Sequence, residues 1–143
     1  MIEQKTFGQK VIEFNKKLSK ISMELPDGFK TINPFNGGQK EIVNEISTTF
    51  YKKFYNDCNK RRMILGSSPA RRGTAVTGVP FEDAEHLQKE TGILIDKFYI
   101  NKSSSGFLYD VIEKYGGCKK FYSDFYMNFV CPVGIVWEDL SRT

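Results

Sequence analysis

The sequence is poor in the residues that build metal and redox centres. It has three cysteines, Cys58, Cys118 and Cys131, and a single histidine, His86, in 143 residues. The cysteines are odd in number and far apart, and no CxxC spacing occurs, which argues against a zinc site or a redox motif. We therefore expect buried, reduced thiols, as in a cytoplasmic protein, and neither a metal nor a cofactor.

Long apolar runs are also missing. The segment from Met1 to Lys10 is polar and charged, and no later run reaches the length of a membrane span. We expect a soluble, cytoplasmic protein that does not contact a membrane. The glycine-rich signatures GxxxxGK[ST] and GxGxxG are absent too, which removes the usual signals of a nucleotide-binding loop.

The remaining composition fits one globular domain. With 40% hydrophobic and 27% charged residues, the chain can bury one core but hardly two. Its formal net charge of +4 suits a polyanionic partner such as DNA. An excess of lysine also keeps many soluble domains dispersed, so charge alone does not identify the partner.

Apolar periodicity predicts two helices in the first part of the chain. Apolar residues recur at spacings of four and three from Phe7 to Ile21, which indicates a first amphipathic helix. Turn signals follow in residues 25–38. A second amphipathic helix is expected from an N-cap at Asn36, with Gln39 three residues on, through Phe54.

Strand and helix signals alternate in the rest of the chain. Arg61 to Gly66 is a short apolar run that predicts a buried strand, and a long loop, Ser67 to Phe81, follows it. Acidic residues in 82–85 and a stop at Gly92 predict the next helix. Another helix is expected from a cap at Ser105 to the Gly116-Gly117 pair. The last predicted element is a strand over 125–131, before Pro132.

This alternation predicts an α/β domain with a parallel sheet. Ligands of such sheets bind beyond the carboxyl ends of the strands, which is where the loop Ser67 to Phe81 lies. Small residues are dense in this loop, which reads GSSPARRGTAVTGVPF from Gly66 to Phe81. They allow backbone amides to approach a ligand closely.

The end of this loop, TGVPF at Thr77 to Phe81, resembles a known motif residue for residue. It is similar to the first active-site motif of the uracil-DNA glycosylase superfamily, especially the bacterial relatives of the single-strand-selective monofunctional uracil-DNA glycosylases. The segments Thr31 to Phe35, Phe54 to Asp57 and Phe107 to Ile112, with the pair Gly116-Gly117, resemble the same branch. The likeness therefore covers most of the chain.

The resemblance implies a three-layer α/β/α uracil-DNA-glycosylase-like fold with a short parallel sheet, formed by residues 1–143 as a single domain. The family's second catalytic motif, a histidine followed by proline and serine, has no counterpart before Thr143. We therefore expect the domain to be truncated at its C-terminus. The last strands of the sheet would then be missing. The strand Met63 to Leu65 would be left with an open apolar edge that invites self-association or a partner segment.

The chemistry that the resemblance implies is base-excision repair. The N-glycosidic bond of uracil, or of a related deaminated base, is hydrolysed after the nucleotide is flipped out of DNA. This reaction needs hydrogen-bond donors near the leaving base, a positioned water near the sugar and an aromatic platform. Ser68 stands where the family carries a water-positioning asparagine, and Asp83 is a rough match, out of register, for an aspartate that other branches use. Both are candidate catalytic residues.

The resemblance also suggests which residues hold the substrate. Phe81 falls where the family stacks a phenylalanine on the flipped base. The family's base-reading position holds Phe129, and Asn128 is one residue off, so strand alternation should turn Asn128 to the other face unless a bulge intervenes. The candidate substrate-binding residues are Gly66, Ser67, Pro69, Phe81 and Asn128, and the candidate DNA-phosphate-binding residues are Arg71, Arg72 and Thr77.

Structural roles compete with these assignments. Phe81 could plug the core, Asp83 could be an acid at a helix N-terminus, and the paired arginines could be solvated charge. His86 is expected on a helix surface. Two other functions stay open: a catalytically inactive DNA-binding remnant, and a small-nucleotide or phosphate-binding domain that uses backbone amides of Gly66 to Gly73.

Overall fold

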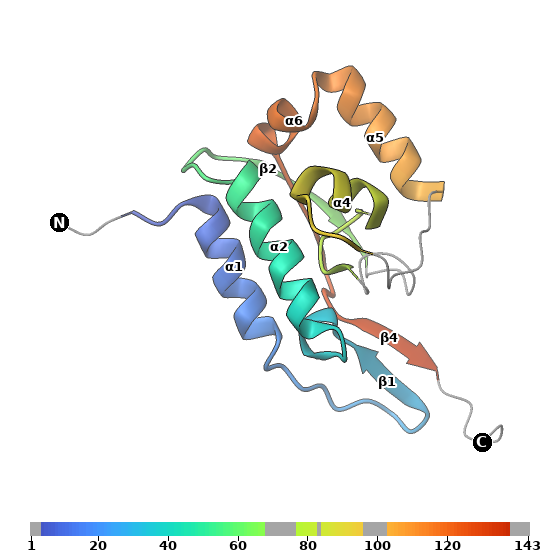
Figure 1. Ribbon diagram of the computed structural model, residues 1–143. Helices are drawn as coiled ribbons and strands as arrows, with labels where there is room; N and C mark the ends of the chain where they lie inside the picture. Colours follow the sequence, from blue (N-terminus) through green and yellow to red (C-terminus); the bar gives the residue numbers. More distant parts are fainter. Residues whose placement is uncertain (1–3, 68–76, 83, 96–102, 138–143) are drawn as a thin grey trace.

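The computed structural model describes residues 4–67, 77–82, 84–95 and 103–137 (Figure 1). Helices and strands alternate along the chain, as the sequence predicts. In chain order the elements are α1 (Phe7–Leu18), β1 (Phe29–Ile32), the 3-10 helix η1 (Pro34–Asn36), α2 (Lys40–Phe54), β2 (Arg62–Gly66), α4 (Ala84–Thr91), α5 (Ser103–Tyr115), α6 (Cys118–Asp124), β3 (Phe125–Phe129) and β4 (Gly134–Trp137). None of the helices in the described residues is long and apolar enough to cross a membrane.

Two small sheets organise the described residues. β2 and β3 pair in parallel, from Arg62 opposite Phe125 to Gly66 opposite Phe129. This confirms the predicted parallel sheet. β1 and β4 form an antiparallel pair that was not predicted, because its strands have four residues each and carry little apolar alternation. In Figure 1 this pair lies beyond the carboxyl end of β3.

Helices pack on both faces of β3. On one face, the ring of Tyr126 lies 5.2 Å from the ring of Phe7 in α1. On the other, the Phe125 ring lies 5.0 Å from Phe121 of α6 and 5.4 Å from Tyr115 of α5. Successive residues of a strand point to opposite faces, so these contacts place β3 between two helical layers. The α/β/α layering is the one that the resemblance implies.

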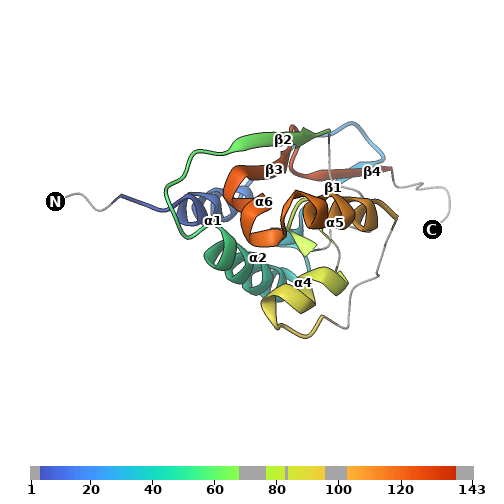
Figure 2. The ribbon, with the colours of Figure 1, turned by 90° about the horizontal axis from the view of Figure 1, so that it is seen from above.

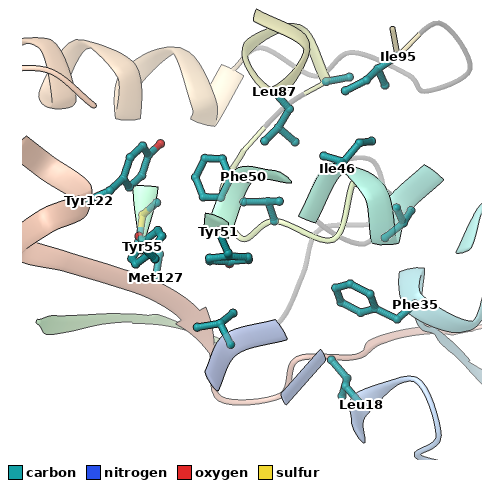
Figure 3. Packing of buried hydrophobic residues seen from close by; sticks show 14 of the residues in the cluster. Leu18, Phe35, Ile46, Phe50, Tyr51, Tyr55, Leu87, Ile95, Tyr122 and Met127 are labelled. Atoms are coloured by element: carbon teal, nitrogen blue, oxygen red, sulfur yellow. The ribbon is translucent and has the colours of Figure 1, made fainter. Parts of the chain in front are cut away.

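α1 and α2 pack closely against each other. A capping box of Thr6 and Gln9 begins α1. α1 crosses α2 at Gly8, where a Cβ atom would lie only 2.6 Å from the Tyr51 carbonyl oxygen, so glycine is required for this approach. Buried residues of α2, including Ile46 and Phe50, carry the contact into the core (Figure 3).

The predicted start of the second helix is wrong. α2 begins at Lys40 with Gln39 as its N-cap, and no side chain caps it. Asn36 instead ends η1, whose own N-cap is Asn33, with its side chain accepting a hydrogen bond from the Phe35 N–H (3.1 Å). The Asn-Pro pair thus starts a separate short turn before the helix. α6 was also not predicted, because it is seven residues long and follows the Gly116-Gly117 break directly.

β2 is not the buried strand that its apolar composition predicts. Met63 is 55% and Leu65 is 53% exposed. Within the described residues β2 pairs with β3 alone, and Figure 2 shows it at the outer edge of the strands, with β3 between it and α2. Within the described residues, the edge of this apolar strand away from β3 has no strand partner.

Arg61 fixes the beginning of β2. Its side chain is fully buried, and its guanidinium group donates to both carboxylate oxygens of Asp57, at 2.8 and 2.9 Å. A further N–H donates to the Tyr122 carbonyl oxygen. The guanidinium carbon lies 4.7 Å from the ring centre of Phe7 and 4.5 Å from that of Tyr55. One cation thus joins α1, α2, α6 and the entry to the parallel sheet.

Candidate functional site

The candidate site is built where the parallel strands end. β2 delivers Gly66 and Ser67, and the ladder continues past β3, because the Val130 N–H donates to the Gly66 oxygen (2.9 Å) and the Cys131 N–H to the Ser67 oxygen (3.0 Å). The chain returns to this edge with residues 77–82. Ser68, Pro69, Arg71, Arg72 and Asp83 lie outside the described residues.

Gly78 anchors the returning segment. Its φ of +79° favours glycine. A Cβ atom there would also lie 2.7 Å from Val43 of α2 and 3.1 Å from Phe35. The glycine of the TGVPF motif is therefore required both for its backbone conformation and for its close approach to the core.

Thr77 is placed differently from its predicted role. It is 2% exposed, and its hydroxyl accepts a hydrogen bond from the Val79 N–H (3.4 Å). In this conformation the hydroxyl is directed to the backbone of its own turn. Thr77 therefore supports the segment that carries Phe81, which is a structural role that the sequence does not distinguish from phosphate binding.

Phe81 lies at the carboxyl end of the sheet, as predicted. Its half-buried ring packs beside the ring of Phe129, with centroids 4.9 Å apart and planes at 32°. Both rings rest on Gly66, where a Cβ atom would lie 2.8 Å from the Phe81 Cζ and 2.8 Å from the Phe129 Cδ1. Gly66 thus forms the floor of a two-ring aromatic surface, which we call the Phe81 platform.

Asn128 does not join the Phe81 platform. β3 runs without a bulge through Phe129, so Asn128 lies on the opposite face, together with Tyr126. Its amide donates to the Tyr126 hydroxyl oxygen (2.6 Å). Together with Phe129 and with Gly78 and Pro80 of the TGVPF segment, it lines a cavity of about 20 Å³ beside α1 and Phe35. This cavity has room for one water and not for a pyrimidine.

A buried carboxylate that the sequence does not reveal follows Phe81 directly. Glu82 is 2% exposed, and its two carboxylate oxygens accept hydrogen bonds from the hydroxyls of Tyr109 and Tyr122. Burial raises the pKa of both phenols, and the Glu82 charge raises each further, so both stay protonated donors at neutral pH. Sequence reasoning treated Glu82 only as an acid at a helix start, because its partners are 27 and 40 residues away.

His86 and the cysteines also differ from their predicted surroundings. His86 is half-buried on α4, and its ring stacks on Tyr109 with centroids 3.6 Å apart, so it is more than a surface residue. Cys58 is exposed, and Cys118 and Cys131 are half-buried, so the prediction of three buried thiols is wrong. Across the described ranges, no three potential metal ligands come together.

The arrangement offers stacking and hydrogen bonding. An aromatic surface stands at the carboxyl edge of a parallel sheet, beside a strand end with backbone groups and a serine, and a buried carboxylate holds the turn behind it. A site of this kind suits a planar, polar ligand that is held by its face.

Comparison with known proteins identifies the fold. No protein-family model matches the chain, and no curated protein matches it. Among solved structures, the crystal structure of wild-type SMUG2 of Pedobacter heparinus matches with a TM-score of 0.85 and 38% sequence identity. The match covers 96% of this chain and 58% of that chain, so the sequence spans somewhat over half the length of the protein it resembles. The chain belongs to the uracil-DNA glycosylase superfamily, near SMUG2.

Proposed function

We propose that this chain is a uracil-DNA-glycosylase-like protein of base-excision repair, which binds DNA and accepts a flipped uracil or a related deaminated base on the Phe81 platform. The observation that carries the proposal is the half-buried Phe81 ring, fixed over Gly66 at the carboxyl end of the parallel sheet. The membership in the superfamily supports the same reaction class.

The proposed reaction is hydrolysis of the bond between the base nitrogen and C1′ of the deoxyribose. The oxygen of water forms the new bond to C1′, the base leaves with the electron pair of the broken bond, and the one proton that the water loses neutralises the base anion. The sugar becomes positively charged as the base leaves, so stacking and hydrogen-bond donors around the base lower the barrier. We assign the water to Ser68 or Asp83 by resemblance alone.

The described residues support a holding role for the platform. A base stacked on an aromatic side chain gains about 1–3 kcal/mol, with little dependence on which base it is. Ser67, exposed just past the end of β2, provides a hydroxyl at the same edge. We propose that Pro69 shapes this rim and that Arg71 and Arg72 contact the flanking phosphates, which would make binding weaken as salt is added.

Base release tests the proposal directly. A labelled single-stranded oligonucleotide with one uracil is incubated with the protein, cleaved with alkali at abasic sites and compared with the same strand carrying thymine. In a binding titration with the same uracil strand, Phe81→Ala should weaken binding about 5- to 150-fold, the equivalent of the lost stacking energy. Phe107→Ala is the matched control, because Phe107 is 74% exposed on α5 and away from the platform.

A second candidate function is DNA binding without turnover. It is favoured by Ser68, which replaces the amide expected at the water-positioning place with a single hydroxyl. Salt-sensitive binding of the uracil strand with no base release would select this function. Binding of free nucleotides with no affinity for oligonucleotides would contradict both.

A further inference from the structure

Phe81 adopts a backbone conformation that a phenylalanine rarely adopts. Its φ is +67°, and among the described residues it is the one non-glycine residue with a positive φ. The Glu82 N–H donates to the Val79 oxygen (3.3 Å), so Val79-Pro80-Phe81-Glu82 is a four-residue turn. Proline suits the second place of such a turn, but a positive φ at the third place normally calls for glycine or asparagine. The turn therefore needs support from outside itself.

That support comes from the residue next to the ring. The Glu82 carboxylate is buried, and each of its oxygens accepts one hydroxyl, from Tyr122 of α6 and from Tyr109 of α5. A carboxylate in a core is costly unless it is paired or hydrogen-bonded, and bonds to an ionised acceptor are among the stronger ones. Moving Glu82 would thus remove the carboxylate acceptor from buried Tyr122 and half-buried Tyr109, which are bonded to each other as well.

The two donors are themselves held firmly. Tyr122 is fully buried, and its ring contacts Phe50 (5.1 Å) and Phe54 (4.8 Å) of α2. Figure 3 shows Tyr122 and Phe50 side by side within the buried cluster. Tyr109 is held against His86 of α4 by ring stacking. The position of the Glu82 carboxylate is therefore set by four helices: α2, α4, α5 and α6.

We infer that Glu82 is a positioning residue: its carboxylate, clamped by Tyr109 and Tyr122, keeps Phe81 in the left-handed conformation that lays its ring over Gly66. The inference rests on the proposed function only for the use of that ring as a base platform. Glu82 does not touch the base. It acts through Phe81, and the helices α5 and α6 set the platform's position through it.

A double-mutant cycle on substrate affinity separates this role from general support of the fold. Glu82→Gln keeps the size of the side chain but removes its charge, and it should weaken binding of the uracil strand on the order of tenfold. In a Phe81→Ala background the same change should have less than about a twofold effect, because the ring through which it acts is gone. An equal loss in both backgrounds would overturn the inference.

Ring NMR decides the question without any substrate. With ¹³C-labelled phenylalanine, the Phe81 ring should show ring-current chemical shifts caused by Phe129, and these shifts should be lost in Glu82→Gln. They should persist in Glu113→Gln, a matched change of an exposed carboxylate on α5. Unchanged Phe81 resonances in Glu82→Gln would refute the clamp. If Glu82→Gln does not fold, Tyr122→Phe, which removes one donor, replaces it with the same two outcomes. A wild-type protein without affinity for the uracil strand defeats the proposed function, and the NMR result still decides on the clamp.

Discussion

Replacing Gly66 by alanine adds one methyl group at the floor of the Phe81 platform. The new Cβ atom would lie 2.8 Å from a carbon of each ring, Phe81 and Phe129. Carbon atoms in contact prefer about 3.5–4.0 Å, so both rings must move away by about 1 Å. The Phe81 backbone is already in a strained conformation and offers little room for adjustment.

Two effects of different size follow from this displacement. Overpacking of this kind costs about 1–3 kcal/mol of the free energy of unfolding. Misplacement of a substrate-holding group by about 1 Å can lower a reaction rate about a hundredfold. We therefore expect Gly66→Ala to remain folded but to release uracil from single-stranded DNA about 10- to 100-fold more slowly in single-turnover experiments.

Gly106→Ala is the control for this prediction. Gly106 lies in α5, and a Cβ atom there meets nothing within 4 Å. Alanine should stabilise the helix by about 0.5–1 kcal/mol and leave base release unchanged. Unfolding in urea gives the stabilities of both variants, and alkaline cleavage gives the rates. A folded Gly66→Ala protein with the wild-type rate would refute the idea that the Phe81 ring must rest where it does.

Three further predictions concern the rest of the chain. Arg61→Met should lower the free energy of unfolding, measured in urea, by about 3 kcal/mol, which is the lower end for a buried ion pair because solvent reaches Asp57. The control Arg62→Met, on exposed β2, should change it by less than about 0.5 kcal/mol. Hydrogen bonds from Arg61 hold the pKa of Asp57 below its ordinary value. The pair therefore stabilises the fold at pH values above the ordinary pKa and loses this effect as the pH falls through the lowered pKa. Asp57→Asn should reduce the loss of unfolding free energy at acidic pH, and an unchanged pH dependence would contradict the assignment. Burial, and then the Glu90 charge, raise the pKa of the Cys118 thiol to about 11, so iodoacetamide should modify exposed Cys58 well before Cys118 at pH 8, as mass spectrometry would show, and the opposite order would be inconsistent with the burial of Cys118.

The sequence predicts those parts of the fold that depend on local patterns. α2 ends at Phe54 as expected, because amphipathic periodicity indicates which helix face is buried. α1 ends three residues before Ile21, the last apolar position of its predicted stripe. The parallel pairing of β2 with β3 also follows from the alternation of helices and strands. The start of α2 was misplaced because Asn36 is a preferred N-cap residue by type, whereas α2 begins after Gln39 without a side-chain cap.

The parts that were missed depend on contacts between distant residues. Phe81 was predicted from a motif, but its pairing with Phe129 joins positions 48 residues apart in numbering, and its support by Glu82 depends on two tyrosines from other helices. The exposure of β2 was missed as well. An apolar run indicates that burial of the side chains would be favourable, but not whether another element packs against them. Asn128, in contrast, points where the alternation of the strand places it.

In the part of the chain that the structure describes, β2 pairs on one side only, which has a consequence for isotope labelling. Along Arg62–Gly66, successive backbone amides point alternately toward β3 and away from it. In heavy water the amides bonded to β3 should keep their protons far longer than those at the free edge, which gives a pattern that changes from residue to residue. Any polypeptide that came to lie along that edge would slow the fast half of the amides and make deuterium uptake even along the strand.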